Sequence, residues 1–298
     1  MNKLSTVDRA RILHLLCEGS SIRAVTRLTG ASKNTVTKLL VDAGKACAAF
    51  HDDTVRGVKA SRVQVDEIWS FTYAKQKNVA AAVRQDLAYG DTWTWTAIEA
   101  DTKMILSYLV GGRDSDYAGA FIADLKDRLA SRVQLTSDGH KAYLGAVEDA
   151  FGADVDYAML VKLYGAAPES AKGRYSPAEC TGIRKTTVEG TPDPKHVSTS
   201  YAERQNLTMR MHMRRFTRLT NAFSKKVENH AHAVALHMMY YNFVRIQSKL
   251  RMTPAMAAGV SDRLWEIADI VALVEAAEAA SAPKVRGPYR KNGAENSN

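Results

Sequence analysis

Three carboxylates in this 298-residue chain, Asp66, Asp138 and Glu203, have the surroundings of metal ligands. Asp66 lies inside an apolar, strand-like run, where a charge is costly unless it is paired or binds a metal. Asp138 directly follows the strand-like run 133–137, and Glu203 lies in a helical run. Carboxylate oxygens suit Mg²⁺ or Mn²⁺, and two such ions roughly 3.5–4 Å apart activate one oxygen and stabilise another in phosphoryl transfer. Together the three side chains predict a site for two divalent cations.

Each of these carboxylates also has a simpler interpretation. Glu67 is adjacent to Asp66, and because side chains alternate across a sheet, we expect only one of the pair to join the site and choose Asp66. Asp138 is also suited to cap a helix that begins near Lys141. A lone helical glutamate such as Glu203 usually faces solvent. The metal interpretation therefore depends on whether the fold brings the three together.

The elements that must position these residues are predicted by periodicity between residues 62 and 164. Alternating β-formers and apolar runs predict strands, and apolar spacing of three and four predicts helices. The expected order is strands 62–71, 92–98 and 104–110, a helix 115–129, a strand 133–137, a helix 141–151 and a strand 155–164. This is the order of the ribonuclease H-like core, an α/β fold with a mixed sheet. Its first and fourth strands are neighbours, so Asp66 and Asp138 should lie side by side.

The segment from Ser5 to Phe50 is predicted to be helical, with a turn at 29–32 between its second and third helices. A helix, a short turn with glycine and a second helix form the helix-turn-helix pattern, whose second helix enters the major groove of DNA with its N-terminal residues. A plain helical hairpin is the alternative. The candidate DNA contacts at this helix start are Ser32, Lys33, Asn34, Thr35 and Thr37.

Residues 165–197 hold four of the seven prolines and are expected to be an irregular loop. A helical region follows from 198 to about 249, with a break near 217–220. Basic residues in it are suited to hold DNA phosphates, although a solvated basic face is the alternative. These candidates are Arg204, Arg210, Arg214 and Arg215, and His140 and Asn206 are candidate auxiliary residues of the metal site. The expected domains are a helix-turn-helix domain 1–55, a ribonuclease H-like domain 60–250, a helical segment 251–282 and a disordered basic tail 283–298.

The composition favours a polyanionic partner. Lys and Arg outnumber Asp and Glu by 41 to 32, a formal net charge of +9, and nucleic acid is the usual partner of such a chain. The three cysteines, Cys17, Cys47 and Cys180, form no CxxC pair, which fits a reducing compartment and leaves no zinc ribbon. Apolar stretches fall short of the roughly 20 residues of a membrane helix, so we expect a cytoplasmic protein without a membrane partner.

Three short motifs occur in order on the expected elements: Val65-Asp66-Glu67-Ile68-Trp69, then Ser137-Asp138-Gly139-His140, then Tyr201-Ala202-Glu203-Arg204-Gln205-Asn206. In this order they resemble the DDE transposases of bacterial insertion sequences, most closely the IS1-type family. Members of that family often carry a basic residue seven positions after the glutamate, where this chain has Arg210. They often begin with a cysteine-rich zinc ribbon, which this chain lacks. The resemblance covers roughly residues 62–245.

The resemblance implies that two Mg²⁺ ions bind Asp66, Asp138 and Glu203 and promote strand cleavage at each transposon end. The freed 3′ hydroxyl would then attack target DNA. The implied partner is double-stranded DNA, both transposon ends and target, so the protein would associate with the bacterial nucleoid. Paired ends imply a homodimer or a higher oligomer. Two alternatives remain open, a ribonuclease H-like nuclease without strand joining and a catalytically decayed DNA-binding regulator.

Overall fold

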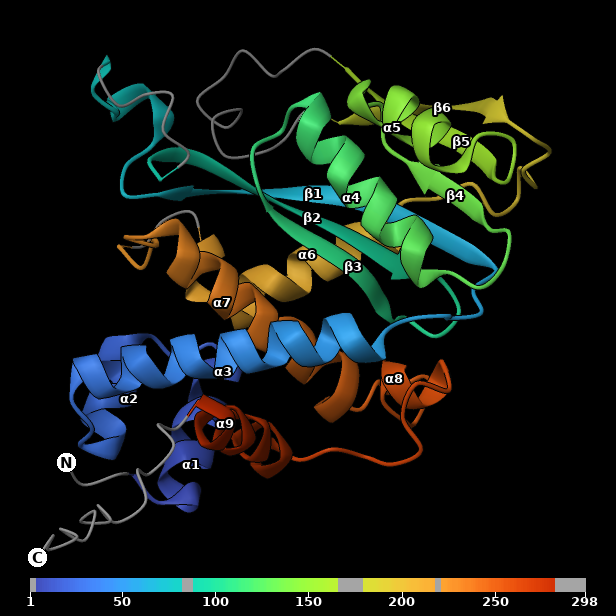
Figure 1. Cartoon of the computed structure of the whole chain (residues 1–298). Helices are drawn as coiled ribbons and strands as arrows, with labels where there is room; N and C mark the ends of the chain where they lie inside the picture. The colour runs from blue at the N-terminus through green and yellow to red at the C-terminus, as the bar shows by residue number, and fades with distance from the viewer. Residues whose placement is uncertain (1–3, 82–87, 166–178, 218–220, 282–298) are drawn as a thin grey trace, which may run out of the picture.

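The computed structural model describes residues 4–81, 88–165, 179–217 and 221–281. Within these residues the chain has an α/β fold built on a mixed sheet of six strands in the order β3-β2-β1-β4-β5-β6 (Figure 1). Strands β1, β4 and β5 run parallel to one another, and the other neighbours are antiparallel. The strands are β1 (Arg62–Thr72), β2 (Gly90–Glu99), β3 (Ile105–Gly111), β4 (Gln134–Ser137), β5 (Asp156–Tyr164) and β6 (Cys180–Glu189).

Helices cover both faces of this sheet. Helix α4 (Ser115–Arg128) and helix α5 (Ala142–Phe151) pack on one face, where the indole ring of the fully buried Trp95 contacts Phe121 and Tyr143. Helices α6 (Ser200–His212) and α7 (Val227–Met239) pack on the other face (Figure 1). The elements expected between residues 62 and 164 are therefore confirmed, with boundaries that shift by one or two residues.

The start of α6 is fixed to β1 by one buried side chain. The amide oxygen Oε1 of Gln64 accepts hydrogen bonds from the backbone N–H groups of Tyr201, at 2.7 Å, and Ala202, at 3.3 Å. The first N–H groups of a helix have no partner within the helix, so an acceptor on the strand satisfies them and sets the position of the helix along β1. Residues 64 and 66 point to the same face, which brings Asp66 under the next turn of α6.

The N-terminal segment forms three helices, α1 (Thr6–Cys17), α2 (Ile22–Thr29) and α3 (Lys33–Thr54), as expected from the sequence. Serine side chains cap all three by accepting a hydrogen bond from a backbone N–H of the first turn. Gly30 ends α2 with φ 73°, a left-handed conformation that favours glycine. Whether this unit reads DNA as a helix-turn-helix stays a prediction.

The C-terminal helices pack back onto the N-terminal ones. Helix α9 (Ile267–Ser281) lies against α1 and α3, and the guanidinium of Arg9 pairs with Glu278 at 3.1 Å. The Phe50 ring of α3 contacts Phe243 and Trp265, with centroid distances of 5.4 and 4.8 Å. One hydrophobic core therefore continues from the sheet through α7 into the N-terminal helices. The expected domain boundaries remain predictions.

Two expectations on the C-terminal half were wrong in detail. Residues 165–197 are not wholly irregular, because 180–189 form β6, which pairs with β5 along nearly its whole length. This edge strand is exposed on both faces, so its sequence lacks the apolar alternation that marks a buried strand. The break in the helical region is also wider than 217–220, since α6 ends at 212 and α7 begins at 227. A short α8 (Pro254–Ala257) precedes α9.

The loop 166–178 and the expected tail 283–298 lie outside the described residues. Among the residues that are described, none of the helices combines the length and the apolar character needed to cross a membrane.

Candidate metal centre

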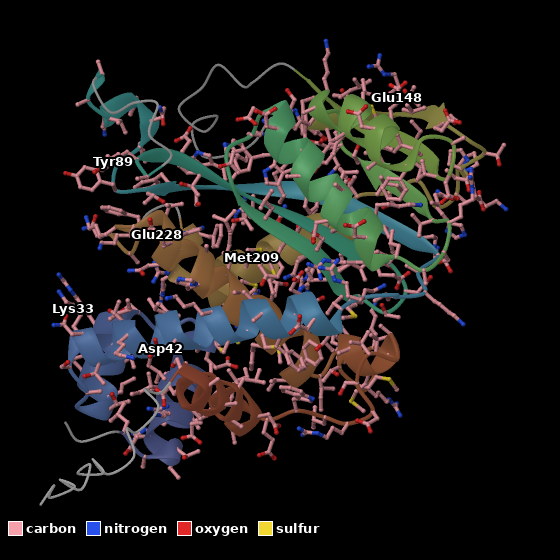
Figure 2. The ribbon with its side chains drawn as sticks, in the orientation of Figure 1. Lys33, Asp42, Tyr89, Glu148, Met209 and Glu228 are labelled. Carbon is pink, nitrogen blue, oxygen red and sulfur yellow. The ribbon has the colours of Figure 1, made fainter. Side chains whose placement is uncertain are left out.

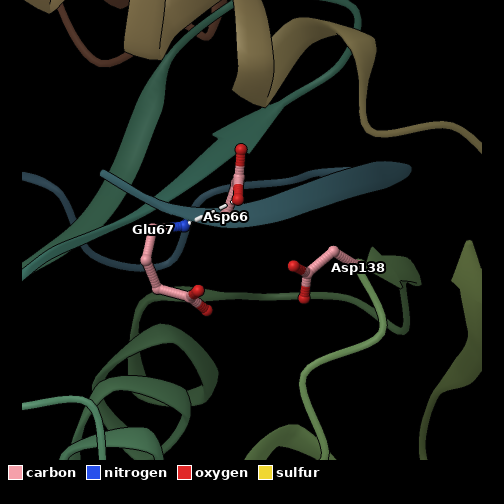
Figure 3. Close-up of side chains that lie close together, drawn as sticks. All are labelled: Asp66, Glu67 and Asp138. Atoms are coloured by element: carbon pink, nitrogen blue, oxygen red, sulfur yellow. Dashed lines mark hydrogen bonds between the residues drawn. The ribbon is translucent and has the colours of Figure 1, made fainter. Parts of the chain in front are cut away.

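Three carboxylates meet where β4 ends beside the middle of β1. Asp66, Glu67 and Asp138 each contribute one oxygen atom to a group in which all atoms lie within 4.8 Å of one another. Asp66 and Glu67 leave β1 on opposite faces, and Asp138 stands beside the strand (Figure 3). The sequence therefore correctly predicted that Asp66 and Asp138 are neighbours.

The expectation that only one of Asp66 and Glu67 can join the site is wrong for this geometry. Strand β4 is four residues long, and its pairing with β1 ends at the partners Gln64 and Thr136. Among the described residues, β1 has no parallel neighbour beyond that point. No paired strand therefore separates the two faces beside residues 66 and 67, and oxygens of Asp66, Glu67 and Asp138 lie within 4.8 Å of one another there.

Asp66 is held from two sides. Its Oδ2 accepts a hydrogen bond from Nδ2 of Asn206 at 2.8 Å, and its Oδ1 accepts one from the backbone N–H of Glu67 at 2.9 Å. Burial raises the pKa of Asp66 to about 7, and the negative charges of Glu67, Asp138 and Glu203 add to the rise. Asn206, expected as an auxiliary residue, therefore orients the central carboxylate.

Glu67 is the most deeply buried carboxylate of the group, with 1% of its side chain exposed. Its Oε2 accepts a hydrogen bond from the Arg113 guanidinium at 3.1 Å, and burial raises the pKa of this carboxyl. Its other oxygen, Oε1, is buried, and a hydrogen bond from the buried hydroxyl of Tyr143 to this carboxylate partly offsets the rise in pKa. The cost of burying the charge is therefore only partly compensated, and a bound cation would stabilise the ionised carboxylate further.

Asp138 shapes the turn that follows β4. Its Oδ1 accepts a hydrogen bond from the backbone N–H of His140 at 2.9 Å. It does not cap α5, whose N-cap residue is Lys141. The His140 ring lies against Trp95, with a centroid distance of 5.8 Å, and its buried Nε2 has no partner in the described structure. His140 therefore faces the apolar side of the site.

Glu203 lies near this group but outside it. Its carboxylate pairs with the ammonium of Lys162 on β5 and accepts a hydrogen bond from Oγ1 of Thr199 at 2.7 Å. Its charge still contributes to the raised pKa of Asp66, so the two carboxylates lie in one electrostatic neighbourhood. The structure places Glu203 on the predicted helix and above the predicted strand, with a lysine as its present partner.

The donor set suits a hard divalent cation. The three grouped residues offer carboxylate oxygens, and two further buried atoms at the site, Oδ1 of Asn206 and Nε2 of His140, have no partner among the described residues. Mg²⁺ and Mn²⁺ prefer oxygen ligands, which the carboxylates supply, and Mg²⁺ usually keeps several waters as its remaining ligands. The residues present therefore fit such an ion.

The residues expected to contact DNA differ in how exposed their side chains are. The hydroxyl groups of Ser32 and Thr35 are hydrogen-bonded to each other at the start of α3, at 2.9 Å, whereas the side chains of Lys33 and Asn34 are exposed. Thr37 is half-buried. The basic candidates after Glu203 divide in the same way: Arg204 and Arg214 are exposed, and Arg210 and Arg215 are half-buried.

Sequence reasoning missed three residues of the site, Glu67, Arg113 and Lys162. The shortness of β4 was visible in the sequence and is the signal that could have kept Glu67 in the group. No signal marks Arg113 or Lys162, because their roles arise from pairing across strands. No protein-family model matches this chain. No curated protein matches it either.

Proposed function

We propose that this protein is a DDE transposase with a ribonuclease H-like core and an N-terminal helix-turn-helix that binds transposon ends. The observation that carries the proposal is the meeting of Asp66, in the middle of β1, and Asp138, just after the end of the parallel strand β4, under a helix that carries Asn206 and Glu203. The resemblance of the three motifs to this family supports it, and so does the net charge of +9.

In this proposal Asp66, Asp138 and Glu203 would together hold two Mg²⁺ or Mn²⁺ ions. Glu67 is a further carboxylate available to either ion. The bound ions would activate a water or a 3′ hydroxyl and stabilise the leaving oxygen of the phosphodiester. Catalysis of this kind is mostly positioning and charge stabilisation, so the roles of the protein are to fix the ligands and to hold DNA.

The residues around the carboxylates have positioning roles in that scheme. Asn206 donates to Asp66 and fixes the orientation of its carboxylate. Arg113 neutralises Glu67, and Lys162 neutralises Glu203 while no cation is bound. Lys33 and Asn34 at the start of α3 are exposed and would contact DNA, as would Arg204 and Arg214. Two ends act together in this scheme, so a homodimer or higher oligomer is part of the proposal.

The test is a cleavage assay on labelled duplexes that carry the DNA ends flanking the gene. We expect nicking at the boundary that needs Mg²⁺ or Mn²⁺, stops with EDTA and is lost in Asp138→Ala. Asp127→Ala, on the outer part of α4, is the matched control and should cleave normally. Specific binding without nicking in either metal would instead favour a DNA-binding regulator. Metal-dependent nicking without strand joining would favour a nuclease.

A further inference from the structure

A cavity of about 380 Å³ lies between the N-terminal helices and the start of α7, away from the carboxylates. The end of α1, helix α2 and the start of α3 form one wall, and the 3₁₀ turn Arg214–Phe216 and helix α7 form the other. Lys33 on α3 and Glu228 on α7 lie at the same side of the molecule (Figure 2). Ligand pockets occupy roughly 300–1,000 Å³, so the cavity is large enough for a small molecule.

The charged side chains that line this cavity are cationic, although Glu18 lies 4.0 Å from the lining residue His212. No aspartate or glutamate is among the described residues that line it, whereas five cationic side chains are. A concave surface lined by one sign of charge attracts ligands of the other sign. The cations are Arg23, Lys33, Arg214, Arg215 and Lys225.

One of these cations, Arg215, is oriented by a chain of hydrogen bonds. Its Nη1 donates to Oγ of Ser224 at 2.8 Å, and that hydroxyl lies 2.8 Å from Nδ1 of His230. Burial lowers the pKa of His230 to about 3, so the ring is neutral. Its Nδ1 then accepts from Ser224, and its Nε2–H donates to Oγ of Ser70, which donates to the carbonyl oxygen of Thr92. The partners of Arg215 in this chain are neutral, and burial lowers its pKa to about 10, so an anion would stabilise it.

A buried histidine that lines the cavity is a second observation that points to a ligand. His237 on α7 lines the cavity and is 3% exposed, yet neither of its ring nitrogens has a partner among the described residues. Burial lowers the pKa of His237 to about 3, so its neutral ring offers one donor and one acceptor. Leu16, Leu40 and Leu236 line the same cavity and give it apolar surface.

We propose that this cavity binds a nucleotide, with the base in the apolar part against His237 and the phosphate at the cations of the rim. A base matches this part because it is flat and largely apolar and carries a donor and an acceptor on its edge. The phosphate matches the rim because guanidinium groups bind phosphate oxygens strongly. An inorganic anion would leave His237 unpartnered, and a fatty acid would leave its two nitrogens unsatisfied as well. The inference does not depend on the carboxylate site.

The first experiment is calorimetric titration of the full chain with deoxyadenosine 5′-monophosphate, in EDTA so that no metal chemistry contributes. We expect saturable binding at one site per chain. His237→Phe keeps a ring of similar size but removes both nitrogens, and it should weaken nucleotide binding about tenfold while leaving inorganic phosphate binding unchanged. Arg23→Gln should weaken both by about tenfold. Arg27→Gln, an exposed cation on the same helix that does not line the cavity, should change neither.

The nucleotide has two sources, a free molecule or a base drawn out of a DNA strand. Duplexes with 2-aminopurine at successive positions distinguish them, because the fluorescence of this base rises when it leaves the stack. A rise that deoxyadenosine monophosphate suppresses identifies DNA as the source, and nucleotide binding without any rise identifies a free nucleotide. The proposal is overturned if no nucleotide binds, if a fatty acid binds in its place, or if Arg23→Gln and Arg27→Gln behave alike. Loss of cleavage would leave these readouts unaffected.

Discussion

Replacing Asp66 with asparagine should stabilise the metal-free protein at pH 8 and remove its response to metal. The carboxylate is half-buried beside other carboxylates, and its pKa is raised from 3.8 to about 7. At pH 8 the Asp66 carboxylate of the folded protein is therefore ionised in an environment that favours the neutral carboxyl. Asparagine has the same shape without the charge. The amide of Asn206 can rotate to present its unpartnered Oδ1 to the new side chain, so the contact between α6 and β1 survives.

The size and sign follow from linkage. A pKa rise from 3.8 to about 7 corresponds to at most about 4 kcal/mol, at about 1.4 kcal/mol per pH unit, and we expect about 2–4 kcal/mol in the solvated site. The folded state binds the proton of Asp66 more tightly than the unfolded state does. The stabilisation that this proton gives to the wild-type protein is therefore fully present below the unfolded pKa near 3.8 and is lost as pH rises through about 7. The advantage of Asp66→Asn should therefore be absent near pH 4, grow through pH 5–7 and level off above.

The assay is urea-induced unfolding of wild type and Asp66→Asn at several pH values between 4.5 and 8.5, in EDTA. A second series replaces EDTA with Mg²⁺ or Mn²⁺. A cation at 100 times its dissociation constant stabilises the protein that binds it by about 2.7 kcal/mol. We therefore expect the cation to reduce or reverse the advantage of the variant, because only wild type keeps the central ligand.

Two results would refute this reasoning. A stability difference that does not change between pH 5 and 8 would mean that the Asp66 carboxylate is not penalised by its surroundings. Equal stabilisation of both proteins by Mg²⁺ or Mn²⁺ would mean that Asp66 is not a ligand. Asp127→Asn, which changes an aspartate away from the site, controls for the loss of one negative charge.

Four further predictions test the surroundings of the site and the packing of the helices. Arg113→Gln should lower stability by about 2 kcal/mol at pH 8, because the buried Glu67 loses its counter-charge, and by less at pH 4, which lies below the raised pKa of Glu67 and favours its neutral carboxyl. Asn206→Ala should weaken Mn²⁺ binding about tenfold in a calorimetric titration, since residues that orient ligands contribute 10–100-fold to affinity. Gly44→Ala should lower stability by about 1–3 kcal/mol in thermal unfolding, because the added Cβ would lie 2.4 Å from a side-chain atom of the facing helix. Gly119→Ala, where nothing lies within 4 Å, should raise stability by about 0.5–1 kcal/mol.

Each of these has a control and a contrary outcome. Arg113→Lys keeps the charge and should recover part of the loss, and a loss that is equal at both pH values would contradict the ion-pair argument. Unchanged Mn²⁺ affinity in Asn206→Ala would remove Asn206 from the site. If the alanine substitutions at 44 and 119 changed stability equally, the argument that α3 and α7 pack closely at Gly44 would be contradicted.

The central sheet was predictable because its strands carry strong local signals. Strand β2 alternates threonine and tryptophan, and its tryptophans point to one face, where Trp95 is fully buried. Strand β1 carries Val63, Val65 and Ile68 as buried apolar residues, and its boundaries agree with the expectation to within one residue. The neighbourhood of Asp66 and Asp138 followed from the strand order, since the first and fourth strands pair in parallel. Local pattern and topology together were enough for these features.

The remaining features depend on contacts that a pattern does not carry. Strand β6 forms because β5 offers it an edge, and its own exposed sequence gives no burial signal. Glu67 joins the carboxylates because β4 is too short to cover β1 at that point. Glu203 is paired with Lys162, a residue of another strand, and nothing in the helical sequence around it predicts that partner. Strand pairing and strand length therefore determine these features, and sequence periodicity alone does not predict them.

The charge balance of the site argues for a divalent cation more strongly than the number of carboxylates does. Four carboxylates lie in one neighbourhood, and two basic side chains pair with two of them: Glu67 with Arg113 and Glu203 with Lys162. Asp66 and Asp138 remain without a basic partner in these pairs, and they are the two that the parallel strands place side by side. A raised pKa at Asp66 is the response of the protein when a proton is the only cation available. A divalent cation would neutralise both charges at once, so metal binding and proton release at Asp66 should be two sides of the same equilibrium.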